Sequence, residues 1–246
     1  MGLKMSDLFV DERRQTPEPA AARTAPAADC HLVEIVLGGF NSPGRIEDRV
    51  RTILAVDGYG KTGLVDCAVS LYRHTEEIHN HMSEKGRVVS YNGCFAIDFI
   101  PFDIDCADNL EDARLSTIRL IETLCDKHKF LIDDILLFFS GASGFHVFAK
   151  SRELGEMGGR TDMQKIVRAM AEKIIGDIPH VDKAIYSGCT RLIRIPNSIN
   201  SKSGLYKIPL LASEIYCMSI LDIKKRAQRQ RNINEAVDEW LEHIPS

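Results

Sequence analysis

The sequence predicts an α+β fold, in which a mixed sheet is joined by an N-terminal αβ unit and short C-terminal helices. Two segments indicate the sheet: Phe99–Asp105 alternates in character as a strand with two different faces does, and Ile135–Phe139 is a short apolar run typical of a central strand. Residues 163–174 repeat apolar side chains at helical spacing. A chain of 246 residues fits one large domain, or one domain with an appendage.

Composition narrows the class of protein. With 44% apolar residues the chain can bury a substantial core, and its net charge of −4 means that nucleic-acid binding would require a local basic patch. Seven cysteines without a CxxC pair favour reduced thiols, so we expect a cytoplasmic location. No apolar run approaches the length of a membrane span and the start does not resemble a signal peptide, so no membrane partner is expected.

The N-terminal part is expected to be partly disordered. Residues 1–30 are rich in Pro and Ala and offer little to bury. Order is expected to begin near His31 with the apolar run Leu32–Leu37, followed by a strand at 52–56. Apolar side chains at helical spacing predict a helix over 64–78.

A β-hairpin is expected around Asn92-Gly93, a dipeptide that suits a type I′ turn between residues 87–91 and 94–97. Its second arm continues into Phe99–Asp105. Because proline cannot donate a ladder hydrogen bond, Pro101 predicts an edge position or a bulge in that strand.

The remaining elements follow in order. Asp108 and Glu111 are expected to cap a helix whose inner stripe contains Leu110, Ala113, Thr117, Ile121, Leu124 and Cys125. The apolar strand at Ile135–Phe139 is expected to turn at 140–144 into a further apolar segment. Further strands are expected at 191–195 and 207–211, and helices at about 213–230 and 234–244.

Asp103 and Asp105 are the first candidate site residues. Side chains of a strand alternate between its faces, so both carboxylates point the same way, with Cα atoms roughly 6–7 Å apart. Two adjacent acids repel unless a cation lies between them, and a pair of divalent ions is the usual device for displacement at phosphorus. The alternative is a solvated edge strand with two surface acids.

Three further groups of residues extend this hypothesis. Small residues at Ser140, Gly141 and Gly144, followed by His146, suit close approach of backbone N–H groups to a phosphate; the alternative is an ordinary glycine turn. Asp182 gains interest because a two-metal site commonly needs a third carboxylate. The last group offers phosphate-compatible donors, of which one arginine is expected to brace an acid instead: Arg191, Arg194, Ser198, Asn200 and Lys202.

Two other motifs compete with this interpretation. Residues 55–62 fit a loose Walker-type phosphate loop, although Ala55 replaces its first glycine; the alternative is a tight βα turn. A zinc site can be composed from His74, His79, His81 and Cys94, but their spacing matches no common zinc pattern.

Taken in chain order, the four groups resemble the motifs of the archaeo-eukaryotic primase superfamily, the primase-polymerases. These are strand-Asp-x-Asp, Ser-Gly-x-x-Gly-x-His, a hydrophobic residue before Asp, and Arg-Leu-x-Arg-x-Pro-x-Ser with Lys-x-Gly. The resemblance extends from about Tyr72 to Leu211, and residues 202–210 are especially similar to primase-polymerases of mobile or defence-associated elements. It implies a tail at 1–30, a catalytic domain at 31–212 with a palm like an RNA-recognition motif, and a helical appendage at 213–246.

The resemblance also implies roles. Two Mg²⁺ or Mn²⁺ ions would be held by Asp103, Asp105 and Asp182. The nucleotide would be contacted by Ser140, Gly141, Gly144, His146, Arg191, Arg194, Ser198, Asn200 and Lys202. The implied activity is that of a template-dependent DNA primase or polymerase, a nucleotidyltransferase that releases pyrophosphate. The implied partners are a single-stranded DNA template, nucleoside triphosphates and a helicase or other replication or defence protein. Ser143 and Asn200 depart from the family, which often has a basic residue and a histidine there.

Other functions remain open at this stage. The same acids could serve a metal-dependent nuclease, the chain could be a non-catalytic template-binding subunit, or residues 55–62 could belong to a P-loop NTPase. The basic stretch 224–231 could contact template backbone or form a solvated helix face balanced by the acids that follow it.

Overall fold

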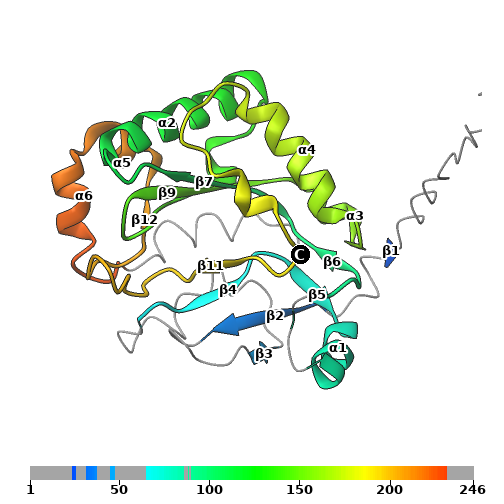
Figure 1. Cartoon of the computed structure of the whole chain (residues 1–246). Helices are drawn as coiled ribbons and strands as arrows, with labels where there is room; N and C mark the ends of the chain where they lie inside the picture. The colour runs from blue at the N-terminus through cyan, green and yellow to red at the C-terminus, as the bar shows by residue number, and fades with distance from the viewer. Residues whose placement is uncertain are drawn as a thin grey trace, which may run out of the picture.

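The computed structural model describes residues 65–85, 88 and 90–231, together with the backbone of three short strands at 24–25, 32–37 and 45–47 (Figure 1). The strand expected at 52–56, the Walker-type loop at 55–62 and the helix expected at 234–244 lie outside these residues, as does most of the expected tail.

Two sheets form the frame of the molecule. The first is four-stranded and runs in the order β12 (Ile208–Leu210), β8 (Ile135–Phe139), β9 (Gly144–Lys150) and β7 (Phe99–Asp105). The second runs in the order β1 (Thr24–Ala25), β10 (Gly159–Arg160), β6 (Phe95–Ala96), β5 (Arg73–Thr75), β2 (Leu32–Leu37), β4 (Ala68–Ser70) and β11 (Leu192–Arg194), with β3 (Arg45–Glu47) paired to β2.

The α+β class is confirmed, with one difference in the sheets. A mixed sheet was expected, but every strand pair that the structure describes is antiparallel. Parallel pairing among the described residues is confined to an isolated bridge between Val65 and Ile199.

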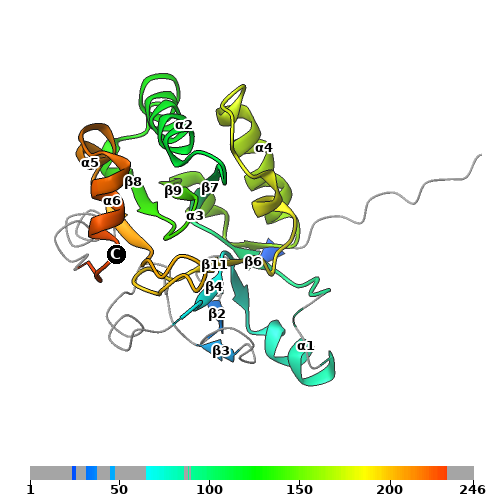
Figure 2. The same ribbon diagram turned by 60° about the vertical axis from the view of Figure 1, so that its left-hand side comes forward.

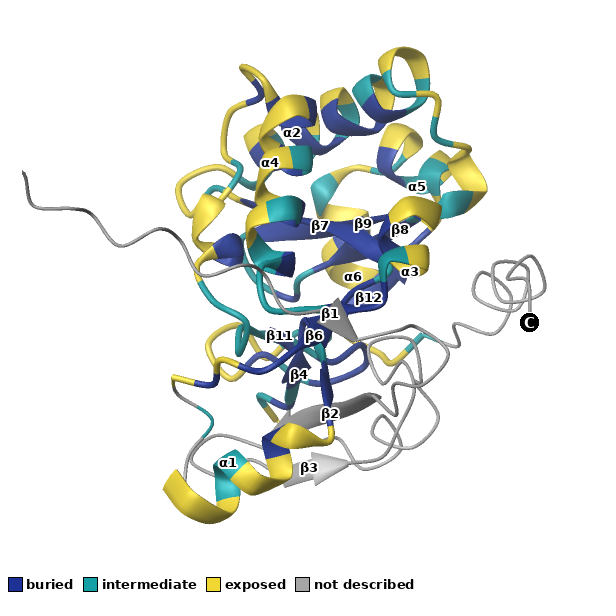
Figure 3. Ribbon diagram, turned by 90° about the vertical axis from the view of Figure 1, so that its right-hand side faces the viewer, coloured by how far each residue is buried: buried dark blue, intermediate teal, exposed yellow. Residues whose placement is uncertain are grey.

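Helices cover one face of the four-stranded sheet, and the second sheet lies on its other side (Figures 1 and 3). The helices α2 (Leu110–Glu122) and α4 (Met163–Ile175) form the covering layer, with α5 (Ala212–Cys217) beside α2. The other described helices are α1 (Glu77–Lys85), α3 (Arg152–Met157) and α6 (Ile220–Arg226). No described helix combines the length and the apolar composition that crossing a bilayer requires.

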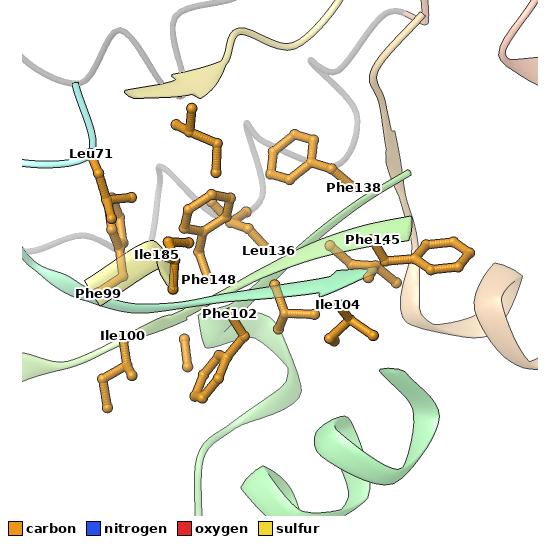
Figure 4. Close-up of a cluster of buried hydrophobic side chains, with 14 of the residues drawn as sticks. Leu71, Phe99, Ile100, Phe102, Ile104, Leu136, Phe138, Phe145, Phe148 and Ile185 are labelled. Atoms are coloured by element: carbon orange, nitrogen blue, oxygen red, sulfur yellow. The ribbon is translucent and has the colours of Figure 1, made fainter. Parts of the chain in front are cut away.

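The two faces of β7 have different roles. Ile100, Phe102 and Ile104 are fully buried and point toward α2, whereas Phe99 lies on the opposite face with Phe148 (Figure 4). Asp103 and Asp105 share the face of Phe99 because side chains alternate along a strand. The apolar face therefore anchors the strand, and the acids are held toward the second sheet.

Pro101 lies on an edge strand, as the sequence predicts. β7 is the last strand of the four-stranded sheet, and Pro101 pairs with Phe148 of β9 on one side only. The helix after this strand is also confirmed, although its N-cap is Asn109 and not Asp108. The Asn109 side chain accepts a hydrogen bond from the backbone N–H of Glu111 at 3.0 Å.

Two expectations for the N-terminal half are wrong. The expected helix over 64–78 is two strands, β4 and β5, followed by α1, because Cys67, Val69 and Leu71 alternate into the core and their backbone pairs with β2 and β11. The expected hairpin is absent from the described residues, since β6 pairs with β5 and β10.

Gly93 leaves room for the Tyr91 side chain at the turn where the hairpin was expected. A Cβ at Gly93 would lie 2.1 Å from the hydroxyl oxygen of Tyr91, so glycine is needed for the Tyr91 ring to pack over this turn. Further along the chain, the expected helix at 213–230 is divided into α5 and α6, and the Ser219 hydroxyl caps the second helix.

Replacing Gly144 by alanine tests the close approach of β9 to β7. A Cβ at Gly144 would lie 1.9 Å from the carbonyl oxygen of Ile104, and backbone on both sides cannot give way cheaply. We expect Gly144→Ala to lower the free energy of unfolding by at least about 2 kcal/mol, the order of overpacking in a well-packed interior. Urea denaturation measures the change. Gly188→Ala is the control because a Cβ there meets nothing within 4 Å, and equal stability of the two variants would contradict the packing described.

Candidate active site

Asp182 lies beside the two acids of β7. The backbone N–H of Asp182 donates to the carbonyl oxygen of Asp103 at 2.8 Å, and the N–H of Asp105 donates to the carbonyl oxygen of His180 at 2.9 Å. Ile104 and Val181 form an antiparallel bridge between these two bonds. The segment 180–182 thus continues the sheet for one step, and Asp182 joins Asp103 and Asp105 at one edge although it is distant from them in sequence.

Asp182 is held in place from its own side as well. Its carboxylate accepts the backbone N–H of Ala184 at 2.8 Å and so caps the short 3₁₀ helix Lys183–Tyr186. At the end of that helix, the Tyr186 hydroxyl donates to the carbonyl oxygen of Pro101 at 2.6 Å. The third acid therefore stands on a turn that is fixed to β7 at both ends.

The pKa of Asp103 reflects the closeness of the three acids. Burial raises the pKa of Asp103 to about 6, and the nearby carboxylates of Asp105 and Asp182 add to the rise. The positive charges of Lys207 and Arg191 oppose it. A carboxylate whose charge is disfavoured by two neighbouring acids is suited to a divalent cation with oxygen ligands. The three carboxylates offer the oxygen donors that Mg²⁺ and Mn²⁺ prefer, but among the described residues they do not form a group whose ligand atoms all lie within 4.8 Å of one another.

His146 lies directly opposite Asp103 in the register of β9 and β7. Its Nε2 is 3.5 Å from the carboxylate of Asp103. Burial, together with the charges of Lys207 and Arg194, lowers the pKa of His146 well below its ordinary value, so the ring is neutral. Among the described residues its Nδ1 has no hydrogen-bond partner, although it is buried.

Lys207 is a residue of this site that the sequence analysis missed. Its side chain is fully buried, and its Nζ donates to the carbonyl oxygen of Arg194 at 2.8 Å. The ammonium also lies over the rings of Phe138 and Phe148, 4.8 and 5.5 Å from their centroids. Burial lowers its pKa, whereas the charge of Asp103 opposes that change. The only signal in the sequence was its position just before an apolar strand, where a lysine is ordinarily exposed.

The two arginines of the β11 segment have different surroundings. Arg194 is the bracing residue, since it donates to the carboxylate of Asp66 at 2.6 Å and to the carbonyl oxygen of Ile199 at 3.1 Å. Burial raises the pKa of Asp66, but the hydrogen bond from Ser201 and the Arg194 guanidinium outweigh it and lower the pKa overall. Arg191 instead acts electrostatically on Asp103. Strand β11 lies on the side of the four-stranded sheet away from α2 and α4 (Figure 2).

The small-residue turn at 140–144 packs against the loop at 200–205. Gly141 has a φ of +84°, and a Cβ there would lie 3.0 Å from the carbonyl oxygen of Leu205, so this close approach requires glycine. The Ser203 hydroxyl donates to the carbonyl oxygen of Gly141. The Ser140 hydroxyl accepts the backbone N–H groups of Ala142 and Gly144 at 3.3 Å each.

Ser198 and Asn200, two further candidates for contact with the nucleotide, form hydrogen bonds with the backbone of their own segment. Ser198 is buried, and its hydroxyl donates to the carbonyl oxygen of Ile195 at 2.8 Å, so it does not face an open surface. The Asn200 side chain accepts the backbone N–H of Lys202 at 3.0 Å and shapes the loop, whereas the Lys202 side chain is exposed. In this structure the Ser198 and Asn200 side chains therefore form hydrogen bonds within the fold.

The alternative zinc group does not assemble. The cluster of three or more metal-ligating side chains that the described residues form consists of Cys106, Asp112 and His180, and includes none of His74, His79, His81 or Cys94. His74 is buried between other groups, with its Nε2 2.9 Å from the carbonyl oxygen of Cys189.

The basic stretch 224–231 is partly neutralised within the fold. Arg226 and Arg231 both form ion pairs with Glu214 of α5, and Lys225 pairs with Asp222. The balancing acids named from the sequence lie beyond residue 231, outside the described part of the chain.

Comparisons with known proteins add one informative match. No protein-family model matches the chain. Among curated proteins it is similar to the DNA primase small subunit PriS of Pyrobaculum aerophilum, with 23% identity, 50% of this chain and 54% of that protein covered. The chain thus spans about half the length of this relative. The match confirms the resemblance to archaeo-eukaryotic primases that the motifs indicate.

A solved structure is also similar to this chain. It is the polymerase domain from Mycobacterium tuberculosis ligase D in complex with DNA, with a TM-score of 0.43, 13% identity, and coverage of 86% of this chain and 87% of that one.

The raised pKa of Asp103 predicts how stability depends on pH without added metal. A carboxyl group whose pKa is higher in the folded state contributes full stability below its unfolded value near 3.8, and that stability is lost as pH rises to about 6. We therefore expect the free energy of unfolding of Asp103→Asn to exceed that of the wild type by up to ~3 kcal/mol near neutral pH, with a higher melting temperature, and the difference to vanish below about pH 4.

Thermal melts of both proteins in a chelator, over this range of pH, measure the difference. Asp177→Asn is the matched control because that side chain is 94% exposed, and it should follow the wild type throughout. An Asp103→Asn variant that is less stable than the wild type near neutral pH would contradict the electrostatic account.

Proposed function

We propose that this chain is a primase-polymerase, which joins nucleoside triphosphates on a single-stranded DNA template and releases pyrophosphate. The observation that carries the proposal is the convergence of Asp103, Asp105 and Asp182 beside His146 and the turn at 140–144. The similarity to a primase small subunit supports the same class of reaction.

The reaction proposed is attack of a 3′-hydroxyl on the α-phosphorus of the incoming nucleotide. Two Mg²⁺ or Mn²⁺ ions held by the three carboxylates would supply the positive charge that activates the hydroxyl and neutralises the phosphates. The protein's own part is to place these carboxylates, and the bond from the Asp182 N–H to Asp103 does so through the backbone. Phosphoryl transfer depends chiefly on such positioning.

The phosphate groups have several donors on the same face of the sheet. The turn at 140–144 lies next to Asp105 and offers the backbone N–H groups of Gly141 and Ser143, because those of Ala142 and Gly144 donate to the Ser140 hydroxyl. Arg191 contributes positive charge near Asp103. His146 is neutral, so its ring can accept or donate a single hydrogen bond without adding charge. Lys202 is exposed on the loop that packs on this turn, and we assign its ammonium to the triphosphate.

Substitution of the acids tests the proposal. We expect Asp103→Ala and Asp105→Ala each to reduce template-dependent incorporation and dinucleotide formation by more than about 1,000-fold, because removing a metal ligand removes most transition-state stabilisation. The assay uses single-stranded DNA, nucleoside triphosphates and Mn²⁺ or Mg²⁺, and circular dichroism shows whether each variant is folded. Asp177→Ala and Lys61→Ala should keep full activity.

The same assay separates joining from cutting. Labelled single-stranded DNA with Mg²⁺ and no nucleotides should keep its length, and it should be extended when nucleotides are added. Shortening without nucleotides would favour the nuclease. Loss of activity in Lys61→Ala with full activity in Asp103→Ala would favour a P-loop NTPase.

Lys207 provides a second test within this site. We expect Lys207→Met to remain folded, since an apolar side chain can replace a buried charge at little cost in stability, but to incorporate nucleotides at least ~10-fold more slowly. The reason is the loss of positive charge beside Asp103. Lys173→Met, exposed on α4, is the control. Wild-type rates in Lys207→Met would show that its charge serves only the fold.

A further inference from the structure

A second group of metal-ligating side chains lies next to the three acids but does not include them. Cys106, Asp112 and His180 each offer one ligand atom, and these atoms all lie within 4.8 Å of one another. They come from three separate segments: the residue after β7, the first turn of α2, and the loop after α4. The function proposed above uses none of them.

Backbone hydrogen bonds hold all three residues where they are. The N–H of Cys106 donates to the carbonyl oxygen of Ser143 at 3.1 Å, and the N–H of Asp112 donates to that of Asn109 at 3.1 Å. The carbonyl oxygen of His180 accepts the N–H of Asp105 at 2.9 Å. The backbone of each ligand is therefore fixed at the edge of the sheet, with the Cys106 side chain partly buried and that of His180 exposed.

The backbone of His180 points to a constraint at this position. Its φ is +64°, in the left-handed region that residues other than glycine adopt infrequently. Such a conformation persists where the surrounding structure determines it, and it often marks a ligand clamp or an active site. Here the left-handed residue is His180 itself, which belongs both to the cluster and to the segment that carries Asp182.

The chemistry of the donors selects the ion. A thiolate and an imidazole are poor ligands for Mg²⁺, which prefers oxygen, but both suit Zn²⁺. A tetrahedral Zn²⁺ with bonds of about 2.0–2.3 Å places its ligand atoms roughly 3.3–3.8 Å apart, which small side-chain rotations could provide here. One thiolate and one carboxylate also balance the charge of the ion.

We propose that Cys106, Asp112 and His180 bind a Zn²⁺ ion, with water in its fourth position. The ion joins β7, α2 and the loop after α4 at one point. Cys106 adjoins Asp105, and His180 lies two residues before Asp182, so the bound ion fixes the third carboxylate against the other two. The binding itself does not depend on the function proposed above; only this consequence does.

Metal binding to the full chain tests the proposal. Metal-stripped protein is titrated with Zn²⁺ in the presence of excess Mg²⁺, which competes for the three carboxylates. We expect one tightly bound Zn²⁺ per chain, and an affinity lower by more than about tenfold in Cys106→Ser, Asp112→Asn and His180→Gln. Cys125→Ser and His128→Gln are matched controls outside the cluster and should bind as the wild type does.

Two further measurements identify the site. Protein loaded with Co²⁺ should show a thiolate-to-metal charge-transfer band that Cys106→Ser lacks and Cys125→Ser retains. Zn²⁺ should slow amide hydrogen exchange at Val181 and Asp182 in the wild type but not in Cys106→Ser. Unchanged Zn²⁺ affinity in Cys106→Ser and His180→Gln, or a charge-transfer band that survives in Cys106→Ser, overturns the proposal.

The two proposals can fail separately. Asp103→Asn should bind Zn²⁺ normally while losing nucleotide incorporation. If the wild type binds no Zn²⁺ yet incorporates nucleotides, the zinc site alone is wrong. If it binds Zn²⁺ through these three residues and incorporates nothing, the zinc site stands and the polymerising reaction is wrong.

Discussion

The arrangement of the site depends on one short piece of backbone pairing, between the end of β7 and residues 180–182. An edge strand presents unpaired N–H and C=O groups, and Pro101 leaves one position of β7 without a donor. The segment after α4 satisfies the groups of Asp103 and Asp105, and Tyr186 satisfies the carbonyl oxygen of Pro101. Closing the edge and placing Asp182 are thus the same structural event.

The negative charges of the three carboxylates at this edge repel one another and so oppose folding. A site that binds cations is expected to have this property, because the bound cations offset the repulsion. Asp103 is buried against two other acids, and the positive charges that oppose the rise in its pKa belong to Lys207, which is fully buried, and to Arg191. His146 stays neutral. Local inconsistency of this kind is expected where function, and not stability, determines the residues.

Local sequence patterns predicted β7 correctly, whereas the segment at 64–78 is determined by its contacts with distant strands. Period-two alternation was sufficient to place Asp103 and Asp105 on one face, and the chemistry of proline was sufficient to place β7 at an edge. The segment at 64–78 could not be resolved in this way, because its apolar residues satisfy helical spacing while alternate ones also enter the core as strands. Lys207 was missed because a lysine before an apolar run is usually exposed to solvent. Its burial depends on the rings of Phe138 and Phe148, which come from other strands and whose contact with Lys207 the local sequence does not show. Asp182 was found only through the order of the motifs, since nothing in its own neighbourhood distinguishes it from a solvated acid.

Motifs that are weak when taken singly form one packed unit here. A Cβ at Gly144 would collide with the carbonyl oxygen of Ile104, so the small-residue turn lies directly on the acidic strand. A Cβ at Gly141 would lie 3.0 Å from the carbonyl oxygen of Leu205, and Ser203 donates to the carbonyl oxygen of Gly141, so the same turn also contacts the loop of Lys202. Each glycine is required by its contact with the next motif, and each motif is positioned by that contact. The order and spacing of these short motifs therefore predict the site better than any single motif does. The reason is that the turn at 140–144 packs against β7 on one side and against the loop at 200–205 on the other.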